Sequence, residues 1–191
     1  MTNDPIAQFR RWFAMARRNA VQPEAMALAT ADRRGRPSVR FVLLKQADAR
    51  GFVFYSNERS RKGKQLDANP YAALAIHWQP LGKQVRVDGR VERVGDAEAD
   101  AYWQSRPRES QLAALASQQS AVLGERSDLV ARWKQLHSTF RDRPVPRPAH
   151  WRGFCLVPQR IEFWTRREHR LHDRELFVRT QHGWKRTLLQ P

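Results

Sequence analysis

Apolar residues recur at helical spacing near the beginning of the chain. They lie three or four positions apart and comprise Ile6, Phe9, Trp12, Phe13 and Ala16. Asn3 or Asp4 can cap the helix that this spacing predicts, and Pro5 suits its first turn. We therefore expect a first helix with one apolar face to bury.

Short extended runs separated by turn residues follow this helix. Alternation of apolar and polar positions predicts strands at 25–31, 38–45, 52–56, 71–78 and 84–94. The turn-rich segment Asp32–Gly35 joins the first two strands into a hairpin, and Asp48–Gly51 forms the next turn. A short polar helix begins at about Ser60 and ends before Asn69. The first half is therefore expected to be mainly antiparallel sheet.

Helical patterns divide this sheet in the middle of the chain. One predicted helix is capped by Asp96, a second follows Pro107 and a third begins at Ser127, which together form a helical insert at about 96–141. Strand patterns return at 151–157, 160–164 and 175–180, within a C-terminal strand region at about 151–191. We expect one domain spanning 1–191, mainly β with flanking helices (α+β), folded as a closed or partly closed antiparallel barrel.

No apolar run is long enough to span a bilayer, and the first five residues lack the layout of a secretory signal. These features predict a cytoplasmic protein without a membrane partner. The one cysteine, Cys155, lies in an apolar run, so we expect a buried and inert thiol.

A net charge of +16 raises the possibility of nucleic-acid binding, because a basic surface attracts polyphosphate without reading its sequence. The 29 arginines and 6 lysines are spread along the chain instead of forming one tail or one helix face. Dispersal favours a solvated basic surface, and we consider a nucleic-acid partner the weaker alternative.

Basic residues accompany two predicted strand ends. Alternation places Arg40, Val42 and Leu44 on one face of a strand, and Phe41, Leu43 and Lys45 on the other. The two charges need a partner, which can be an acidic side chain, solvent or an anionic ligand. In the second cluster, Tyr55 and Ser56 end a strand and Ser60 is the expected helix cap before Arg61 and Lys62. Such a helix start can bind phosphate, whereas a capped helix with a basic solvent face is the ordinary alternative.

Two further clusters lie in the second half. Tyr102, Arg106 and Ser110 can together receive a phosphate monoester if the helix persists to Arg106, although a helix end with an exposed arginine remains the alternative. Arg170, His172 and Arg174 alternate, so an extended backbone would point all three to one face, toward solvent or an anionic pocket. The histidine spacing does not favour a metal site, so we expect none.

The sequence contains no Gly-rich phosphate loop in a strand-to-helix context and no Gly-x-Ser-x-Gly motif, and Cys155 has no obvious base nearby. Hydrolysis therefore has little support. A redox reaction carried out by a bound cofactor requires few protein nucleophiles and fits these residues better.

Taken in order, these clusters closely resemble the pyridoxamine 5'-phosphate oxidase family from about Glu24 to the C-terminus. The combined motifs are specific and comprise Arg-x-Val-Leu-Leu-Lys, Ser-Arg-Lys, Ser-Arg-Pro-Arg-x-Ser-Gln, Gln-Ser and Arg-Leu-His-Asp-Arg. The resemblance implies an FMN-binding split β-barrel, and a homodimer with two sites at its interface, each built from both chains.

The resemblance also implies the site residues. The family's flavin contacts fall on Arg40, Phe41, Val42, Leu43, Leu44, Lys45, Tyr55, Ser56, Arg61, Lys62, Gln84, Gln119, Ser120, Trp164 and Arg174. Its substrate contacts fall on Lys45, Tyr102, Arg106, Ser110, Arg170 and His172. Among these, Arg170 and His172 are expected to orient the reacting carbon and to stabilise charge.

The implied reaction is FMN-dependent oxidation of pyridoxamine or pyridoxine 5'-phosphate by dioxygen. The products would be pyridoxal 5'-phosphate and hydrogen peroxide, with ammonia released from the amine. A flavin oxidase of another aromatic ring, as in the phenazine pathway, is the nearest alternative. Many family members carry a longer basic segment that helps to cover the substrate, whereas only a few residues precede the first helix here, which leaves lid closure open.

Overall fold

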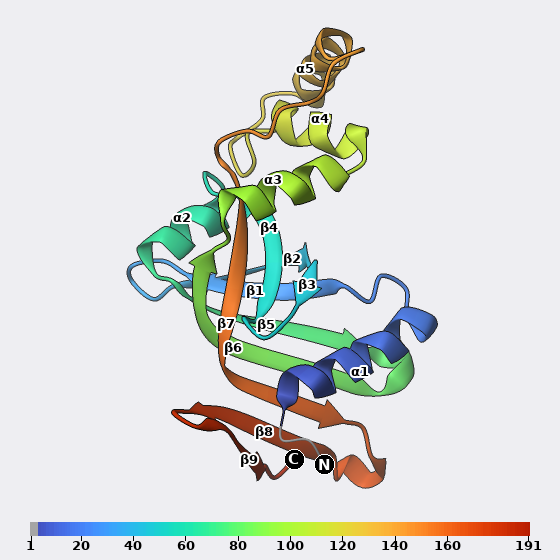
Figure 1. Ribbon diagram of the computed structural model, residues 1–191, viewed down its shortest axis with the longest axis vertical. Helices are drawn as coiled ribbons and strands as arrows, with labels where there is room; N and C mark the ends of the chain where they lie inside the picture. The colour runs from blue at the N-terminus through green and yellow to red at the C-terminus, as the bar shows by residue number, and fades with distance from the viewer. Residues whose placement is uncertain (1–3) are drawn as a thin grey trace. The chain divides into compact units, whose positions relative to one another are not determined.

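The computed structural model describes residues 4–191 (Figure 1). Its helices are α1 (Pro5–Asn19), α2 (Arg61–Ala68), α3 (Asp96–Ser105), α4 (Arg108–Ala116) and α5 (Arg126–Thr139), with short 3-10 turns η1 (Gln79–Leu81) and η2 (Glu168–Arg170). Its strands are β1 (Ala25–Ala31), β2 (Pro37–Leu43), β3 (Gln46–Ala47), β4 (Phe52–Asn57), β5 (Tyr71–Trp78), β6 (Lys83–Arg93), β7 (Trp151–Thr165), β8 (Asp173–Thr180) and β9 (Gly183–Leu188).

Helix α1 forms as the apolar spacing predicts. The Asp4 carboxylate caps it by accepting a hydrogen bond from the Ile6 N–H at 2.9 Å, whereas the alternative cap, Asn3, lies outside the described residues. Phe9 is fully buried, and its ring meets the edge of Phe52 at a centroid distance of 4.8 Å. The apolar face of α1 therefore packs against the sheet.

The strands form one sheet in the order β2-β1-β5-β6-β7-β4-β3, with β8 paired to both β7 and β9. β1 and β2 pair antiparallel from Ala25 opposite Leu43 to Ala31 opposite Pro37, which confirms the predicted hairpin. Gly35 in its turn has a φ of +76°, a conformation that glycine adopts without the strain of a Cβ atom. β5–β6, β7–β8 and β8–β9 also pair antiparallel.

The contacts divide the chain into two compact units. The first contains residues up to Phe54, Gln65–Glu92 and Phe154–Pro191, and the second contains Tyr55–Lys64 and Arg93–Gly153. The first unit is built around large buried apolar side chains of β1, β4, β5 and α1. The second is built around Trp103, Leu112 and Trp151, with α4 packed on α5. The single-domain organisation stays a prediction.

Three details of the predicted elements are wrong. Gly95 is the N-cap of α3, and Asp96 lies in its first turn, where the carboxylate accepts hydrogen bonds from Arg147 and Arg152. The predicted strands 151–157 and 160–164 are one strand, β7, because Pro158 removes one N–H donor without forcing the extended backbone to turn. Strands β3 and β9 were not predicted, because two or six residues between turns give little alternation to recognise.

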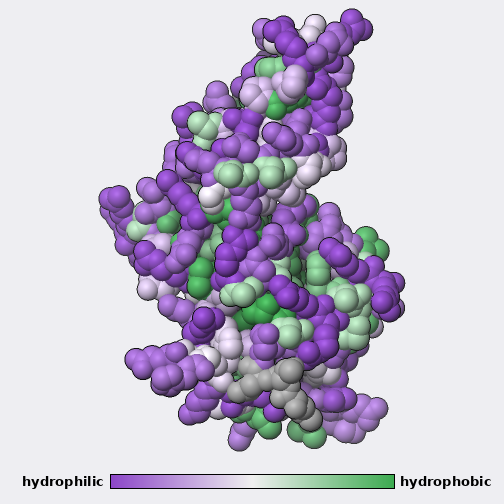
Figure 2. All heavy atoms as spheres, viewed as in Figure 1, coloured by the Kyte–Doolittle hydropathy of each residue, from purple (hydrophilic) through white to green (hydrophobic). Residues whose placement is uncertain are grey.

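The face of the molecule in Figure 2 is covered mainly by hydrophilic residues, with small hydrophobic patches between them. Such a surface agrees with the net charge of +16 and with basic residues spread along the chain. No helix of residues 4–191 is both long and apolar enough to cross a membrane.

Candidate cofactor and substrate site

Lys62 is the centre of a polar cluster in the second unit. Its ammonium donates to the Gln119 side-chain oxygen at 2.8 Å, to Ser56 Oγ at 2.9 Å and to Ser60 Oγ at 3.4 Å. Only 8% of Lys62 is exposed, although lysine is rarely buried. An ammonium that already donates to hydroxyl and amide oxygens can also bind an anionic group through a charge-assisted hydrogen bond.

The backbone beside Lys62 is folded tightly. Ser60 caps α2, as predicted, because its Oγ accepts from the Gly63 N–H at 3.3 Å and donates to the Asn57 carbonyl at 2.7 Å. A Cβ atom on Gly63 would lie 2.1 Å from the Glu58 carbonyl oxygen, so only glycine fits there. Arg61, the first residue of α2, is exposed. The cluster therefore combines a helix start, a buried lysine and an exposed arginine.

Gln119 and Ser120 lie in the loop between α4 and α5, and both are exposed. Ser120 has a φ of +72°, a left-handed conformation that non-glycine residues rarely adopt. This backbone turn follows directly on the residue that binds Lys62. The structure thus brings together Ser56, Lys62 and Gln119 from the predicted flavin set.

An aromatic stack lies in the same unit. The rings of Tyr55 and Tyr102 are 4.1 Å apart with an interplanar angle of 18°, and Tyr55 also stacks on Trp151 at 5.1 Å and 10°. Gly153 allows this arrangement, since a Cβ atom there would lie 2.8 Å from Tyr55 Cε1. Tyr55, a predicted flavin contact, is therefore in direct contact with Tyr102, a predicted substrate contact.

Arg106 lies at the end of α3, beyond the last helical turn. Its φ of −73° and ψ of 145° are extended, because a residue before proline avoids the helical region. The condition of a helix persisting to Arg106 is therefore not met. The guanidinium nevertheless lies over the rings of Trp103 and Trp151, and Ser110 occupies the first turn of α4.

Burial lowers the pKa of Arg106, and the nearby Tyr102 phenol partly opposes this effect. Nη1 of Arg106 is buried and has no hydrogen-bond partner among residues 4–191. A cation in such a place is stabilised when an anion supplies the missing acceptor.

Arg40 is the best-connected predicted site residue in the first unit. Its guanidinium donates to Thr30 Oγ1 at 2.6 Å, Ser38 Oγ at 2.5 Å and the Gln65 side-chain oxygen at 3.3 Å, and also to the Leu28 carbonyl. The sequence predicted an acidic side chain, solvent or an anionic ligand as the partner of Arg40. The structure shows that its partners include neutral hydroxyl, amide and carbonyl oxygens.

The rest of the motif around Arg40 differs in exposure. Phe41 is 77% exposed on β2, which is an edge strand of the sheet, whereas Leu44 is 4% exposed and Val42 and Leu43 are half-buried. Lys45 follows the strand, is exposed, and donates its backbone N–H to the Val53 carbonyl at 2.8 Å.

Trp164 and His172 lie together in the first unit, with ring centroids 4.6 Å apart. His77 meets Trp164 from another strand at 6.5 Å, and Gln84 is the partner of His77 in the β5–β6 register. The predicted flavin contacts Gln84 and Trp164 are thus connected through His77, which sequence reasoning missed.

Arg174 on β8 is bound by Glu162 on β7. Its Nε donates to Glu162 Oε1 at 2.8 Å and its Nη2 to Oε2 at 3.2 Å, while Nη1 donates to the Gln190 carbonyl. The hydrogen bonds and opposite charge of Glu162 raise the pKa of Arg174 above its ordinary value, and burial opposes this effect. Glu162 is 8% exposed and also pairs with Arg86 at 3.3 Å, so one buried carboxylate holds two arginines.

The predicted common face of Arg170, His172 and Arg174 is wrong. Glu168–Arg170 form the turn η2, in which His169 and Arg170 have φ values of +54° and +62°, and the strand begins only at Asp173. His172 accepts a hydrogen bond from the Arg167 backbone N–H at its Nδ1, while Arg170 is exposed. Alternation fails because these residues are not extended. The described residues contain no group of three or more His, Cys, Asp or Glu able to hold a metal ion.

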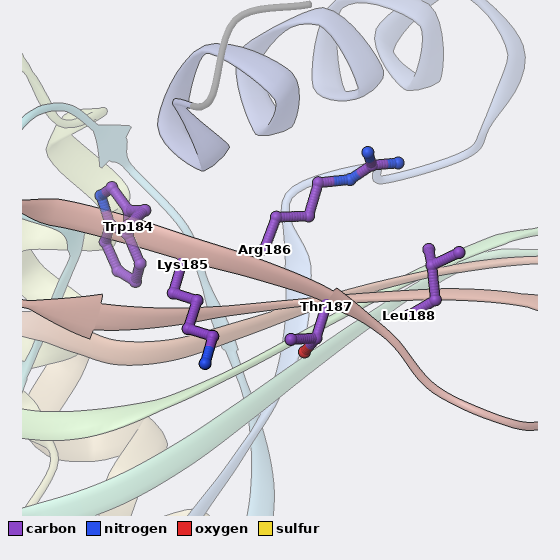
Figure 3. A pocket seen from close by; sticks show the side chains of 5 residues that line it. All are labelled: Trp184, Lys185, Arg186, Thr187 and Leu188. Atoms are coloured by element: carbon purple, nitrogen blue, oxygen red, sulfur yellow. The ribbon is translucent and has the colours of Figure 1, made fainter.

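A depression of about 570 Å³ lies along β9. It is lined by Trp184, Lys185, Arg186, Thr187 and Leu188 (Figure 3). Arg186 is fixed by an ion pair to Glu175 at 2.6 Å. None of the predicted site residues lines this depression.

Comparison with known proteins connects these groups to one family. Residues 15–140 match the sequence model of pyridoxamine 5'-phosphate oxidase, and residues 151–191 match that of the pyridoxine 5'-phosphate oxidase C-terminal dimerisation region. This chain belongs to the pyridoxamine 5'-phosphate oxidase family. The family assignment made from the motifs is therefore confirmed.

Two relatives within this family are similar over nearly their whole length. The pyridoxine/pyridoxamine 5'-phosphate oxidase of Myxococcus xanthus (strain DK1622) is 56% identical over 98% of this chain and 92% of its own. That of Anaeromyxobacter dehalogenans (strain 2CP-C) is 53% identical over 98% and 96%. This oxidase family member therefore corresponds to almost the full length of both relatives.

Solved structures of related proteins share the fold. PhzG from Burkholderia lata 383, in complex with tetrahydrophenazine-1-carboxylic acid, is 34% identical with a TM-score of 0.94, covering 100% of this chain and 94% of that one. A pyridoxamine 5'-phosphate oxidase-related, FMN binding protein from Nostoc punctiforme has a TM-score of 0.76 at 18% identity, covering 96% and 97%. The predicted antiparallel split barrel with flanking helices is confirmed.

Proposed function

We propose that this chain is an FMN-dependent oxidase that converts pyridoxamine or pyridoxine 5'-phosphate and dioxygen to pyridoxal 5'-phosphate and hydrogen peroxide. Ammonia is the further product from the amine. The observation that carries the proposal is the guanidinium of Arg106, which lies over the Trp103 and Trp151 rings and whose buried Nη1 has no hydrogen-bond partner among residues 4–191. Such a group is a receptor for a substrate phosphate. Its relatives named pyridoxine/pyridoxamine 5'-phosphate oxidase, at 56% and 53% identity, support the same reaction.

The residues around Lys62 suit the phosphate of FMN. Lys62 and Ser56 would hold that phosphate, Gln119 and Ser120 would border it, and exposed Arg61 would add positive charge. When bound, FMN supplies a group that accepts a hydride equivalent from the substrate C4' carbon and is reoxidised by dioxygen. The remaining flavin contacts are proposed from the resemblance, on Arg40–Lys45, Tyr55, Gln84, Trp164 and Arg174.

Substrate binding is assigned to a second group of side chains. Tyr102, Arg106 and Ser110 hold the substrate phosphate through hydrogen bonds and charge. Arg170 and His172 orient the reacting carbon and stabilise charge near it, and Lys45 contacts the substrate from the end of β2. His172 is held by the Arg167 N–H, which fixes its Nδ1 as an acceptor.

The assembly we propose is a homodimer with both sites at its interface, each built from residues of both chains. It is supported by the match of residues 151–191 to the family's dimerisation region. The cytoplasmic location stays a prediction from the sequence.

A flavin oxidase that acts on a phenazine-type ring is the second candidate, because PhzG has a TM-score of 0.94 to this chain. The two candidates differ in the anion of the substrate, which is a phosphate monoester for one and a ring carboxylate for the other.

Anaerobic mixing of FMN-loaded protein with each substrate class separates the candidates. We expect pyridoxamine and pyridoxine 5'-phosphate to bleach the flavin absorption band, and tetrahydrophenazine-1-carboxylic acid to bleach it far more slowly. Failure of the protein to bind FMN, or bleaching only by the phenazine-type substrate, would contradict the proposal.

A further inference from the structure

Two indole rings enclose the guanidinium of Arg106. Its Cζ lies 4.9 Å from the ring centroid of Trp151 and 5.1 Å from that of Trp103, within the range of cation–π contacts. Arg106 belongs to neither α3 nor α4, so no helical turn fixes the direction of its side chain. The faces of Trp103 and Trp151 are therefore aromatic contacts of a guanidinium that extends from the segment between two helices.

Trp151 is itself held rigidly. It is 6% exposed, and its ring is parallel to those of Tyr55 and Tyr102 at interplanar angles of 10° in both cases. Its other neighbour is Trp103, whose ring it meets at 4.8 Å and 71°. Trp103 is fixed in turn by a hydrogen bond from its Nε1 to the Val145 carbonyl at 2.8 Å. Trp151 thus contacts Tyr55, which is a proposed flavin ligand. It also contacts the proposed substrate ligands Tyr102 and Arg106.

The indole environment removes water from Arg106 without replacing every lost hydrogen bond. Nη1 is buried without a partner among the described residues, and the aromatic faces supply attraction for the charge but no oxygen acceptor. Among residues 4–191 no carboxylate forms an ion pair with Arg106. A guanidinium held in this way has much to gain from a phosphate oxygen, and little freedom to lose when it binds one.

We propose that Trp151 is a positioning residue for Arg106 and sets the affinity for the phosphate group of the substrate. The proposal rests on the proposed function, in which Arg106 binds that phosphate. Trp151 acts through Arg106 by stacking against its guanidinium, and it touches neither the reacting carbon nor dioxygen. Its effect therefore falls on substrate affinity and not on the chemical step.

The test compares Trp151→Phe with Trp133→Phe in the FMN-loaded enzyme. Trp133 belongs to the same apolar cluster but its ring contact is with His137, at 5.3 Å, so the second variant is a matched control. Phenylalanine keeps an aromatic ring in the core while weakening the cation–π contact. We expect Trp151→Phe to raise KM for pyridoxamine 5'-phosphate by roughly three- to tenfold with kcat within about twofold, and Trp133→Phe to change neither beyond about twofold.

A double-mutant cycle shows whether Trp151 acts through Arg106. In an Arg106→Ala background, Trp151→Phe should have no further effect on KM, because the group that it positions has been removed. A purely structural role predicts the same KM change in both backgrounds. That result, or equal effects of the Trp151 and Trp133 variants in the otherwise wild-type enzyme, would overturn the proposal.

Binding of inorganic phosphate separates this inference from the proposed function. If the wild-type protein oxidises neither pyridoxamine 5'-phosphate nor pyridoxine 5'-phosphate, the proposed function fails. The dissociation constant for inorganic phosphate, measured at saturating FMN, then decides the role of Trp151. Weaker phosphate binding in Trp151→Phe than in Trp133→Phe supports the inference. Equal binding in both variants overturns it.

Discussion

Arg174 on β8 and Glu162 on β7 form a two-point ion pair, with Nε to Oε1 at 2.8 Å and Nη2 to Oε2 at 3.2 Å. The β7–β8 register pairs Arg174 with Trp164, so Glu162 is its diagonal neighbour on the sheet. The carboxylate thereby fixes the direction of a proposed flavin contact. Arg86 and Arg174 share this one buried carboxylate, so replacing Glu162 removes two ion pairs, whereas replacing either arginine removes one.

Replacement of Glu162 by Gln should weaken FMN binding and lower the thermal midpoint. Loss of charged hydrogen bonds at a buried group costs about 1.5–3 kcal/mol, so we expect an FMN dissociation constant roughly 10- to 100-fold higher. Flavin fluorescence titration and thermal unfolding measure the two effects. Arg86→Gln removes the more exposed partner and should cost less than about 1 kcal/mol. Equal effects of both variants would contradict the role assigned to the Arg174 pair.

Replacement of Lys62 by Met should reduce FMN affinity by roughly 10- to 100-fold, since a charge-assisted hydrogen bond to phosphate is lost. Lys64 lies on the same helix but is exposed, which makes Lys64→Met the matched control. Equilibrium titration with FMN and with riboflavin distinguishes the phosphate from the ring. The prediction fails if Lys62→Met weakens riboflavin binding as much as FMN binding.

Addition of a methyl group at Gly153 should displace Tyr55. The new Cβ atom would lie 2.8 Å from both Tyr55 Cε1 and Val94 Cβ, and overpacking of this kind costs about 1–3 kcal/mol. We expect Gly153→Ala to lower the urea unfolding midpoint and to weaken FMN binding. The control is Gly124→Ala, because a Cβ atom on Gly124 would meet only Asp128 Oδ2, at 3.6 Å, which is an ordinary van der Waals contact. An unchanged unfolding midpoint in Gly153→Ala would refute the predicted clash.

Glu175 should make part of the stability depend on acid pH. Burial raises its pKa, but hydrogen bonds from Arg186 and Gln8 outweigh burial, so the net pKa lies below the ordinary value of 4.5. The stabilisation is present above that ordinary value and is lost as pH falls through the lower folded-state pKa. The free energy of unfolding, measured with urea at several acid pH values, should fall less steeply with decreasing pH in Glu175→Gln than in the wild type. Gln8→Ala should show an intermediate dependence. The same pH dependence in Glu175→Gln as in the wild type would disprove the contribution assigned to Glu175.

The residues that sequence reasoning located correctly depend on local rules. Asp4 and Ser60 cap their helices, and the β1–β2 hairpin follows from alternation around a glycine turn. Each of these features is determined by residues within a few positions of one another. The family motifs are local in the same sense, and so the family could be identified before the fold was known.

What the sequence did not reveal depends on contacts between distant segments. Glu162 and Arg174 are twelve positions apart and meet only through the β7–β8 register, while Trp151 meets Tyr55 from a strand far along the chain. The turn at His169 and Arg170 was missed because neither residue type usually adopts a positive φ. Because of this turn, Arg170, His172 and Arg174 do not share one face, although Trp164 and His172 remain in contact.

The central claim is tested most directly by measuring the ratio of pyridoxal 5'-phosphate formed to hydrogen peroxide released. FMN-loaded protein in air should convert pyridoxine 5'-phosphate to pyridoxal 5'-phosphate with one peroxide per aldehyde, and Arg106→Ala should raise KM by roughly tenfold or more through loss of a charged hydrogen bond. Absence of aldehyde with both the alcohol and the amine substrate, in protein that has bound FMN, would contradict the account.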